Sequence, residues 1–136
     1  WGFWVHRQEV PETLLALGLV SDEPKARAAA AEALTQEARR GNLARLLALL
    51  KDQHEMVRLS AAEAIGKANV RSAEAVGALV AALTPPGEAA RQGICRVLEQ
   101  LTGERIPYDP SADAEAREKT LAGWKDYWAA NRQKFK

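Results

Sequence analysis

The residue types that most often perform catalysis or bind metals are few and scattered in this chain. The histidines are His6 and His54, which lie far apart, and Cys95 is the single cysteine. Neither these residues nor any carboxylate cluster stands at the spacing that a metal ion needs, and motifs for a nucleophile or a phosphate-binding loop are missing from the sequence. The sequence therefore predicts no metal, no cofactor and no catalytic residue. We expect His54 in a loop, solvated or capping a helix, and Cys95, between Ile94 and Val97, in the core.

An arginine recurs along the chain at Arg27, Arg58 and Arg91, with offsets of 31 and 33 residues. A guanidinium group offers a two-pronged set of donors, so such a column could line a groove for phosphate or carboxylate groups. The alternative is a structural ladder that ties neighbouring repeats together. The ladder is favoured because Asp52 supplies a carboxylate partner of the kind that arginine pairs with.

A second column of charged residues contains Glu32, Glu63 and Arg96. Two carboxylates at equivalent places could suggest acid–base chemistry, but the third member has the opposite charge. The alternation of sign instead predicts a solvated helix face with ion pairs between repeats.

Apolar residues recur with the same offsets and define the elements that must position these columns. One helix of each unit shares three small or aliphatic columns on one face: Ala30, Ala61 and Ile94; Ala33, Ala64 and Val97; Leu34, Ile65 and Leu98. The helix before it shares two leucine columns: Leu15, Leu46 and Leu79; Leu19, Leu50 and Leu83. Each unit is therefore a helix pair, and the sequence predicts helices at residues 10–19, 22–39, 43–51, 55–68, 73–83, 88–101 and 113–132.

Composition and repeat together predict the fold class. Hydrophobic residues make up 47% of the chain and aromatic residues only 6%, and abundant alanine favours packed helices over a sheet. We expect an all-α fold, an α-solenoid of about three stacked antiparallel helix pairs with a C-terminal aromatic capping helix. The expected parts are an N-terminal aromatic segment at 1–9, repeats at 10–103 (10–40, 42–70 and 73–103), and a loop with the capping helix at 104–136. The capping helix presents an apolar face of Leu121, Trp124, Tyr127 and Trp128.

The run of residues 52–65, which begins with Asp52, has Arg58 six residues later and continues with small residues, resembles a HEAT repeat. It is similar in particular to the short HEAT-like units of bacterial and phycobilin-lyase-type proteins, and the likeness covers residues 12–102. The resemblance implies a hydrogen-bonded ladder between repeats, carried by Asp52 and Arg58. Ser21 and Pro85 stand where the other units would have the aspartate, so the ladder is expected to be incomplete at both ends.

The same resemblance implies that the second helix of each pair lines the concave surface. On the middle unit, several residues fall outside the core columns: Met56, Leu59, Ser60, Glu63 and Lys67. Met56 and Leu59 form a candidate apolar spot for gripping a partner, and Glu63, Lys67 and Arg96 complete the candidate partner-binding set. The expected function is a protein–protein interaction scaffold, or an accessory subunit of a larger and membrane-associated assembly, without catalysis. The alternative is a HEAT-like enzyme such as a bilin lyase or a DNA glycosylase, but three units hardly provide the long groove that such work needs.

The net charge of the chain bears on the kind of partner to expect. Nineteen Lys and Arg against eighteen Asp and Glu leave a net charge of +1, which disfavours nucleic acid and leaves a protein partner as the expectation. Near the C-terminus, Lys134 and Lys136 are expected to be a frayed basic tail.

Trp1, Phe3 and Trp4 precede a basic residue, as at the interfacial end of a membrane span. We therefore expect membrane association, through a segment before Trp1, or export rather than a free cytoplasmic location. The alternative is a processed leader, with tryptophan packed on the first helix.

Overall fold

The computed structural model describes residues 21–33 and 43–135, and this part of the chain is helical without strands. The elements are α2 (Pro24–Ala33), α3 (Leu43–Leu49), α4 (Glu55–Lys67), α5 (Ala73–Ala81), α6 (Glu88–Thr102), α7 (Ala114–Asn131) and the 3-10 turn η2 (Arg132–Lys134). The predicted all-α fold is confirmed. The helix expected at 10–19 and the end of the one expected at 22–39 lie outside the described residues.

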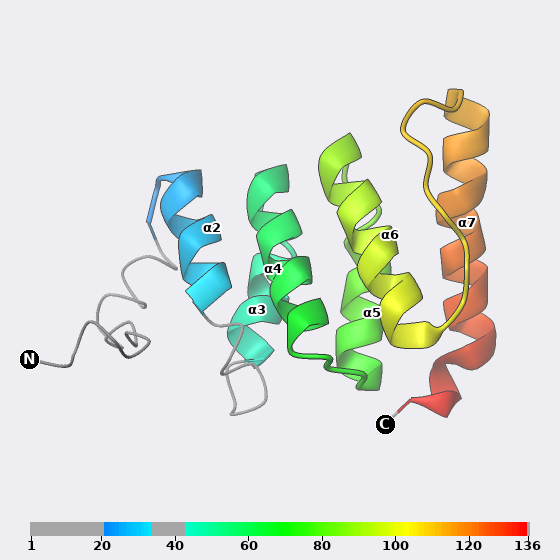
Figure 1. Ribbon diagram of the computed structural model, residues 1–136, viewed down its shortest axis with the longest axis horizontal. Coiled ribbons are helices and arrows are strands. Elements are labelled where there is room, and N and C mark those ends of the chain that lie inside the picture. The colour runs from blue at the N-terminus through cyan, green and yellow to red at the C-terminus, as the bar shows by residue number, and fades with distance from the viewer. Residues whose placement is uncertain (1–20, 34–42, 136) are drawn as a thin grey trace, which may run out of the picture.

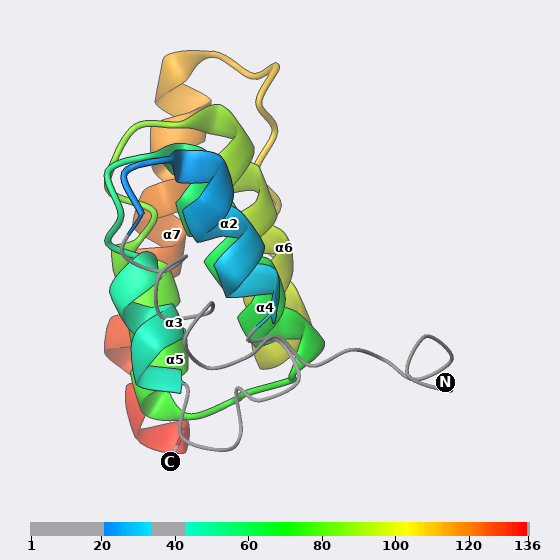
Figure 2. The ribbon, with the colours of Figure 1, turned by 90° about the vertical axis from the view of Figure 1, so that its left-hand side faces the viewer.

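The helices form two layers. Helices α2, α4 and α6 stand side by side in one layer, and α3, α5 and α7 in the other (Figures 1 and 2). Helix α3 packs on α4 and α5 packs on α6, so each pair spans the two layers. This is the stacked arrangement of a solenoid, in which each unit contacts only its neighbours.

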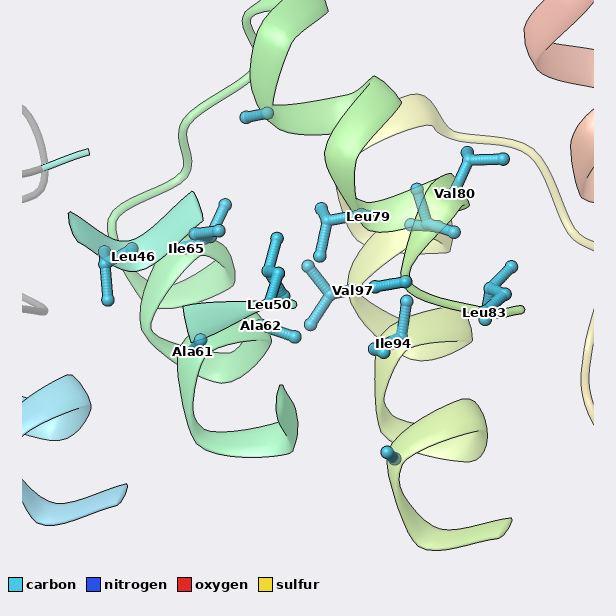
Figure 3. Close-up of a cluster of buried hydrophobic side chains, with 14 of the residues drawn as sticks. Leu46, Leu50, Ala61, Ala62, Ile65, Leu79, Val80, Leu83, Ile94 and Val97 are labelled. Atoms are coloured by element: carbon cyan, nitrogen blue, oxygen red, sulfur yellow. The ribbon is translucent and has the colours of Figure 1, made fainter. Parts of the chain in front are cut away.

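The core lies between the layers, where the predicted columns meet. Leu46 and Leu79 are fully buried, as are Ile65 and Leu98. Figure 3 shows apolar side chains from α3, α4, α5 and α6 gathered between the layers, among them Leu46, Ile65, Leu79 and Ile94. The second and third units therefore place equivalent residues in equivalent positions. The corresponding Leu15 and Leu34 of the first unit lie outside the described residues.

Helix α4 is more buried than its apolar stripe predicts. Arg58, Ser60, Ala62 and Gly66 are buried although they lie outside the core columns. The reason is that α4 contacts α2, α3 and α6. A central solenoid helix is enclosed on three sides, so the placement of Ser60 away from the packed faces was wrong.

Short polar residues and a tight turn fix where the helices begin. His54 caps α4, because its Nδ1 accepts a hydrogen bond from the backbone N–H of Met56 at 3.2 Å. Ser72 and Asp113 cap α5 and α7 in the same way through their side-chain oxygens. Before α6, Gly87 has φ 141°, a conformation that side-chain-bearing residues rarely adopt. The predicted capping role of His54 is confirmed.

The C-terminal helix closes the far end of the stack. Trp124 is fully buried, and its indole N–H donates to the carbonyl of Ile106 at 2.9 Å. Trp128 lies against Gly77 of α5 and against Phe135. Lys134 lies in the 3-10 turn η2, and the next residue, Phe135, packs against the core. The expectation that Lys134 belongs to a frayed tail was therefore wrong. Lys136 lies outside the described residues.

Candidate partner-binding site

The arginine ladder joins neighbouring units, as the resemblance implies. Arg27 donates two hydrogen bonds to Asp52, Nε to Oδ2 at 2.7 Å and Nη2 to Oδ1 at 3.0 Å. The aspartate therefore pairs with the arginine of the preceding unit. Arg58, the other residue that the resemblance assigned to the ladder, donates to the Asp52 backbone carbonyl at 2.9 Å.

Each arginine also holds the turn before its own helix. Arg27, Arg58 and Arg91 donate to the carbonyl six residues earlier, on Ser21, Asp52 and Pro85, at 2.6, 2.9 and 3.1 Å respectively.

The second contact of Arg58 and Arg91 reaches the next unit or the cap. Arg58 reaches the carbonyl of Pro86 at 2.7 Å, and Arg91 lies 3.9 Å from Glu118 of α7. Arg58 is only 3% exposed. The arginine column therefore stabilises the stack and does not line a groove.

The ionisation of Asp52 reflects this pairing. Burial raises the pKa of the carboxyl, but the hydrogen bonds from Arg27 and from the backbone N–H of His54 outweigh burial and hold the pKa below its usual value. Both charged side chains are largely shielded, with 12% of Arg27 and 11% of Asp52 exposed. A shielded bidentate pair is stronger than an ion pair in open solvent.

A groove of about 590 Å³ runs between α4 and α6. Leu59, Glu63 and Lys67 line it from α4, and Gln92, Arg96 and Gln100 line it from α6. Four of the five predicted partner-binding residues are thus brought together. The fifth, Met56, does not line the groove. It lies one turn before Leu59 on α4 and is 46% exposed.

Two glycines set the width of this groove. Leu59 of α4 lies where a Cβ on Gly93 of α6 would stand, and a Cβ on Gly66 of α4 would lie 3.2 Å from Val97 of α6. The amide of Gln100 also donates to the Gly66 carbonyl at 2.7 Å. The helices therefore interlock reciprocally at the base of the groove.

The charged side chains of the groove are exposed. In the part of the chain that the structure describes, Glu63, Lys67 and Arg96 form no hydrogen bond or ion pair. The inter-repeat pair expected between Glu63 and Arg96 is therefore not formed, although both lie on a solvated face as predicted. Gln92 and Gln100 were not singled out from the sequence, although they occupy the same columns as Leu59 and Lys67.

The described residues hold no group of three or more metal-ligating side chains. Cys95 is buried, and its burial raises the pKa of the thiol to about 12, so the thiol stays protonated at neutral pH. Trp1, Phe3 and Trp4 lie outside the described residues. Among the helices described, none has the length and apolar character needed to cross a membrane.

Comparison with known proteins bears on the family. A family model for HEAT repeats matches residues 11–99, which is well over half of the chain. No curated protein and no solved structure matches the chain. The stacked helix pairs and the family match agree, and the chain belongs to the HEAT-repeat family.

Proposed function

We propose that this protein is an interaction module that holds a protein partner along the groove between α4 and α6, without catalysing a reaction. HEAT repeats commonly serve as protein-interaction scaffolds. The observation that carries the proposal is the groove itself, where exposed charged groups flank apolar Leu59 and Met56 stands at one end.

The contrast between two sets of charged residues supports this role. The arginine column donates to backbone carbonyls and to Asp52, although the Nε of buried Arg58 has no hydrogen-bond partner among the described residues. The groove charges have no such partners among the described residues. Exposed apolar surface rimmed by polar groups is typical of interaction sites.

A paired-variant experiment tests the proposal. Met56→Glu with Arg96→Glu alters the groove, and Ala44→Glu with Lys125→Glu makes the same change of net charge on exposed residues of α3 and α7. Each tagged double variant is expressed in the native source and purified after cross-linking. Partners captured by the unaltered protein should be lost from the groove variant and kept by the control.

Two outcomes contradict the proposal. One is a partner set that the groove variant retains in full. The other is a HEAT-like enzyme, seen as a pigment absorbance that co-purifies with the protein or as base release from DNA.

We further propose that the module is an accessory subunit of a membrane-associated assembly. The support is the sequence Trp1, Phe3 and Trp4 followed by basic Arg7, a pattern typical of membrane interfaces. Fractionation of the native source tests this proposal. The protein should sediment with membranes, and recovery entirely in the supernatant contradicts it.

A further inference from the structure

Building on the interaction function proposed above, we infer that the groove binds an acidic amphipathic peptide segment. An apolar side chain of the segment packs on Met56 and Leu59, and a carboxylate lies between Lys67 and Arg96. Two features of the groove favour such a ligand: the change from apolar to charged residues along α4, and the excess of cations over anions among its charged side chains.

The groove changes character along its length. At the end where α4 and α6 begin, the groove is lined by exposed Ala89 and half-buried Leu59, and Met56 is exposed one turn outside it. Towards the end of both helices the walls carry Glu63 and Arg96 and then Lys67. A ligand that matches this surface has an apolar end and a charged end.

The charged end favours an anion. Lys67 and Arg96 stand on opposite walls and outnumber Glu63, and all three are exposed. The arginine fork suits a carboxylate, and lysine adds a second donor. Because Glu63 repels a carboxylate at its own level, the anion belongs near Lys67, one turn further along α4.

The helix geometry sets the spacing of the two ligand groups. Leu59 and Lys67 are eight residues apart on α4, a rise of about 12 Å. A helical ligand therefore places its apolar and acidic residues about eight positions apart, and an extended ligand about four apart. The occupant is a short segment of a partner protein.

A peptide selection tests the inference with a defined probe. A phage-displayed library of random peptides is selected on the immobilised full chain, and the enriched peptides are synthesised with a fluorophore. They should carry Asp or Glu at one of the two spacings from Leu, Ile, Met or Phe. Their affinity should fall about tenfold or more in Lys67→Glu with Arg96→Glu, and added salt should weaken binding.

Matched variants show whether charge is the cause. Arg105→Glu with Lys125→Glu makes the same change of charge on exposed residues away from the groove and should leave affinity unchanged. Peptides whose acidic residue is replaced by Lys should regain affinity for Lys67→Glu with Arg96→Glu. All variants change exposed side chains, and circular dichroism checks that each is folded.

The outcomes separate this inference from the proposed function. Peptides that Met56→Glu weakens, but that lack an acidic residue or tolerate the charge reversal, overturn the inference and leave the interaction function standing. A selection that yields only peptides indifferent to both groove variants contradicts the inference and the proposed function together.

Discussion

At Asp52 one carboxylate joins two units of the stack. It accepts two hydrogen bonds from Arg27 and one from the backbone N–H of His54 at 2.9 Å, so it fixes both the contact with α2 and the entry into α4. Charge-assisted bonds of this kind contribute about 1.5–3 kcal/mol each to stability when shielded.

Replacement of Asp52 by Asn is therefore expected to lower the free energy of unfolding by about 1–3 kcal/mol. The folded pKa of Asp52 is depressed, so its contribution is present above the unfolded pKa of about 3.9 and is lost as the pH falls through the folded pKa. In urea unfolding, the difference in the free energy of unfolding between the two proteins should be smaller at acid pH than at neutral pH. Asp126→Asn on exposed α7 is the control, expected within about 0.5 kcal/mol of the unaltered chain.

Cys95 gives an independent probe at the same scale. Its thiol is buried and its pKa is raised to about 12, so both access and thiolate formation are suppressed in the folded state. Alkylation near pH 8 should be roughly a hundredfold or more slower in the native chain than in denaturant. Fast alkylation without denaturant would show that α6 is not packed as described.

At the scale of elements, close approach between helices depends on missing side chains. Trp128 of α7 lies so near Gly77 of α5 that a Cβ there would stand 2.9 Å from the indole ring. The Trp128 ring of the cap helix therefore packs directly on the α5 backbone at Gly77. Gly123, elsewhere on α7, has only Ile106 nearby, at 3.4 Å from a Cβ.

These two glycines should respond oppositely to alanine. Gly77→Ala forces the Trp128 ring to move and is expected to destabilise the protein by about 1–3 kcal/mol. Gly123→Ala meets only ordinary contact and gains helix propensity, so it should be neutral or stabilising by up to about 1 kcal/mol. Thermal unfolding followed by tryptophan fluorescence measures both, and equal effects would count against the described seat of Trp128.

At the scale of the whole molecule, the loop and α7 substitute for a further repeat. Helix α7 packs on α5, while the loop contributes Tyr108, whose hydroxyl donates to Glu88 of α6 at 2.6 Å. Both layers are thus covered at this end, as a solenoid requires.

Removal of residues 104–136 should therefore expose the end of the core. We expect the shortened chain to bind a hydrophobic dye and to self-associate, because the uncovered faces of α5 and α6 are apolar. Removal of residues 133–136 alone leaves α7 in place and should have a much smaller effect. Sedimentation velocity distinguishes the two, and a monomeric, dye-free shortened chain would contradict the capping role.

The sequence predicted the helix pairs because their apolar columns repeat, and it located four of the groove residues because they fall outside those columns. It named Asp52 and the three arginines as the ladder but not which arginine the Asp52 side chain binds, and the stacking offset between units places Asp52 beside Arg27. That offset is a property of packing and cannot be read from one helix. Gln92 and Gln100 were overlooked because neutral amides carry no pattern of their own.

The hydrogen bond from each arginine to the carbonyl six residues earlier also determines where a unit can change length. The connection between Leu46 and Arg58 has the same length as that between Leu79 and Arg91, whereas the step from Ile65 to Leu79 is two residues longer than that from Leu34 to Leu46. The arginine contacts thus fix the length of the connections on one rim of the stack. The connection on the opposite rim, residues 68–72, can vary in length (Figure 1). We therefore expect insertions to be accommodated in the connections on that second rim, without disturbing the arginine contacts on the first.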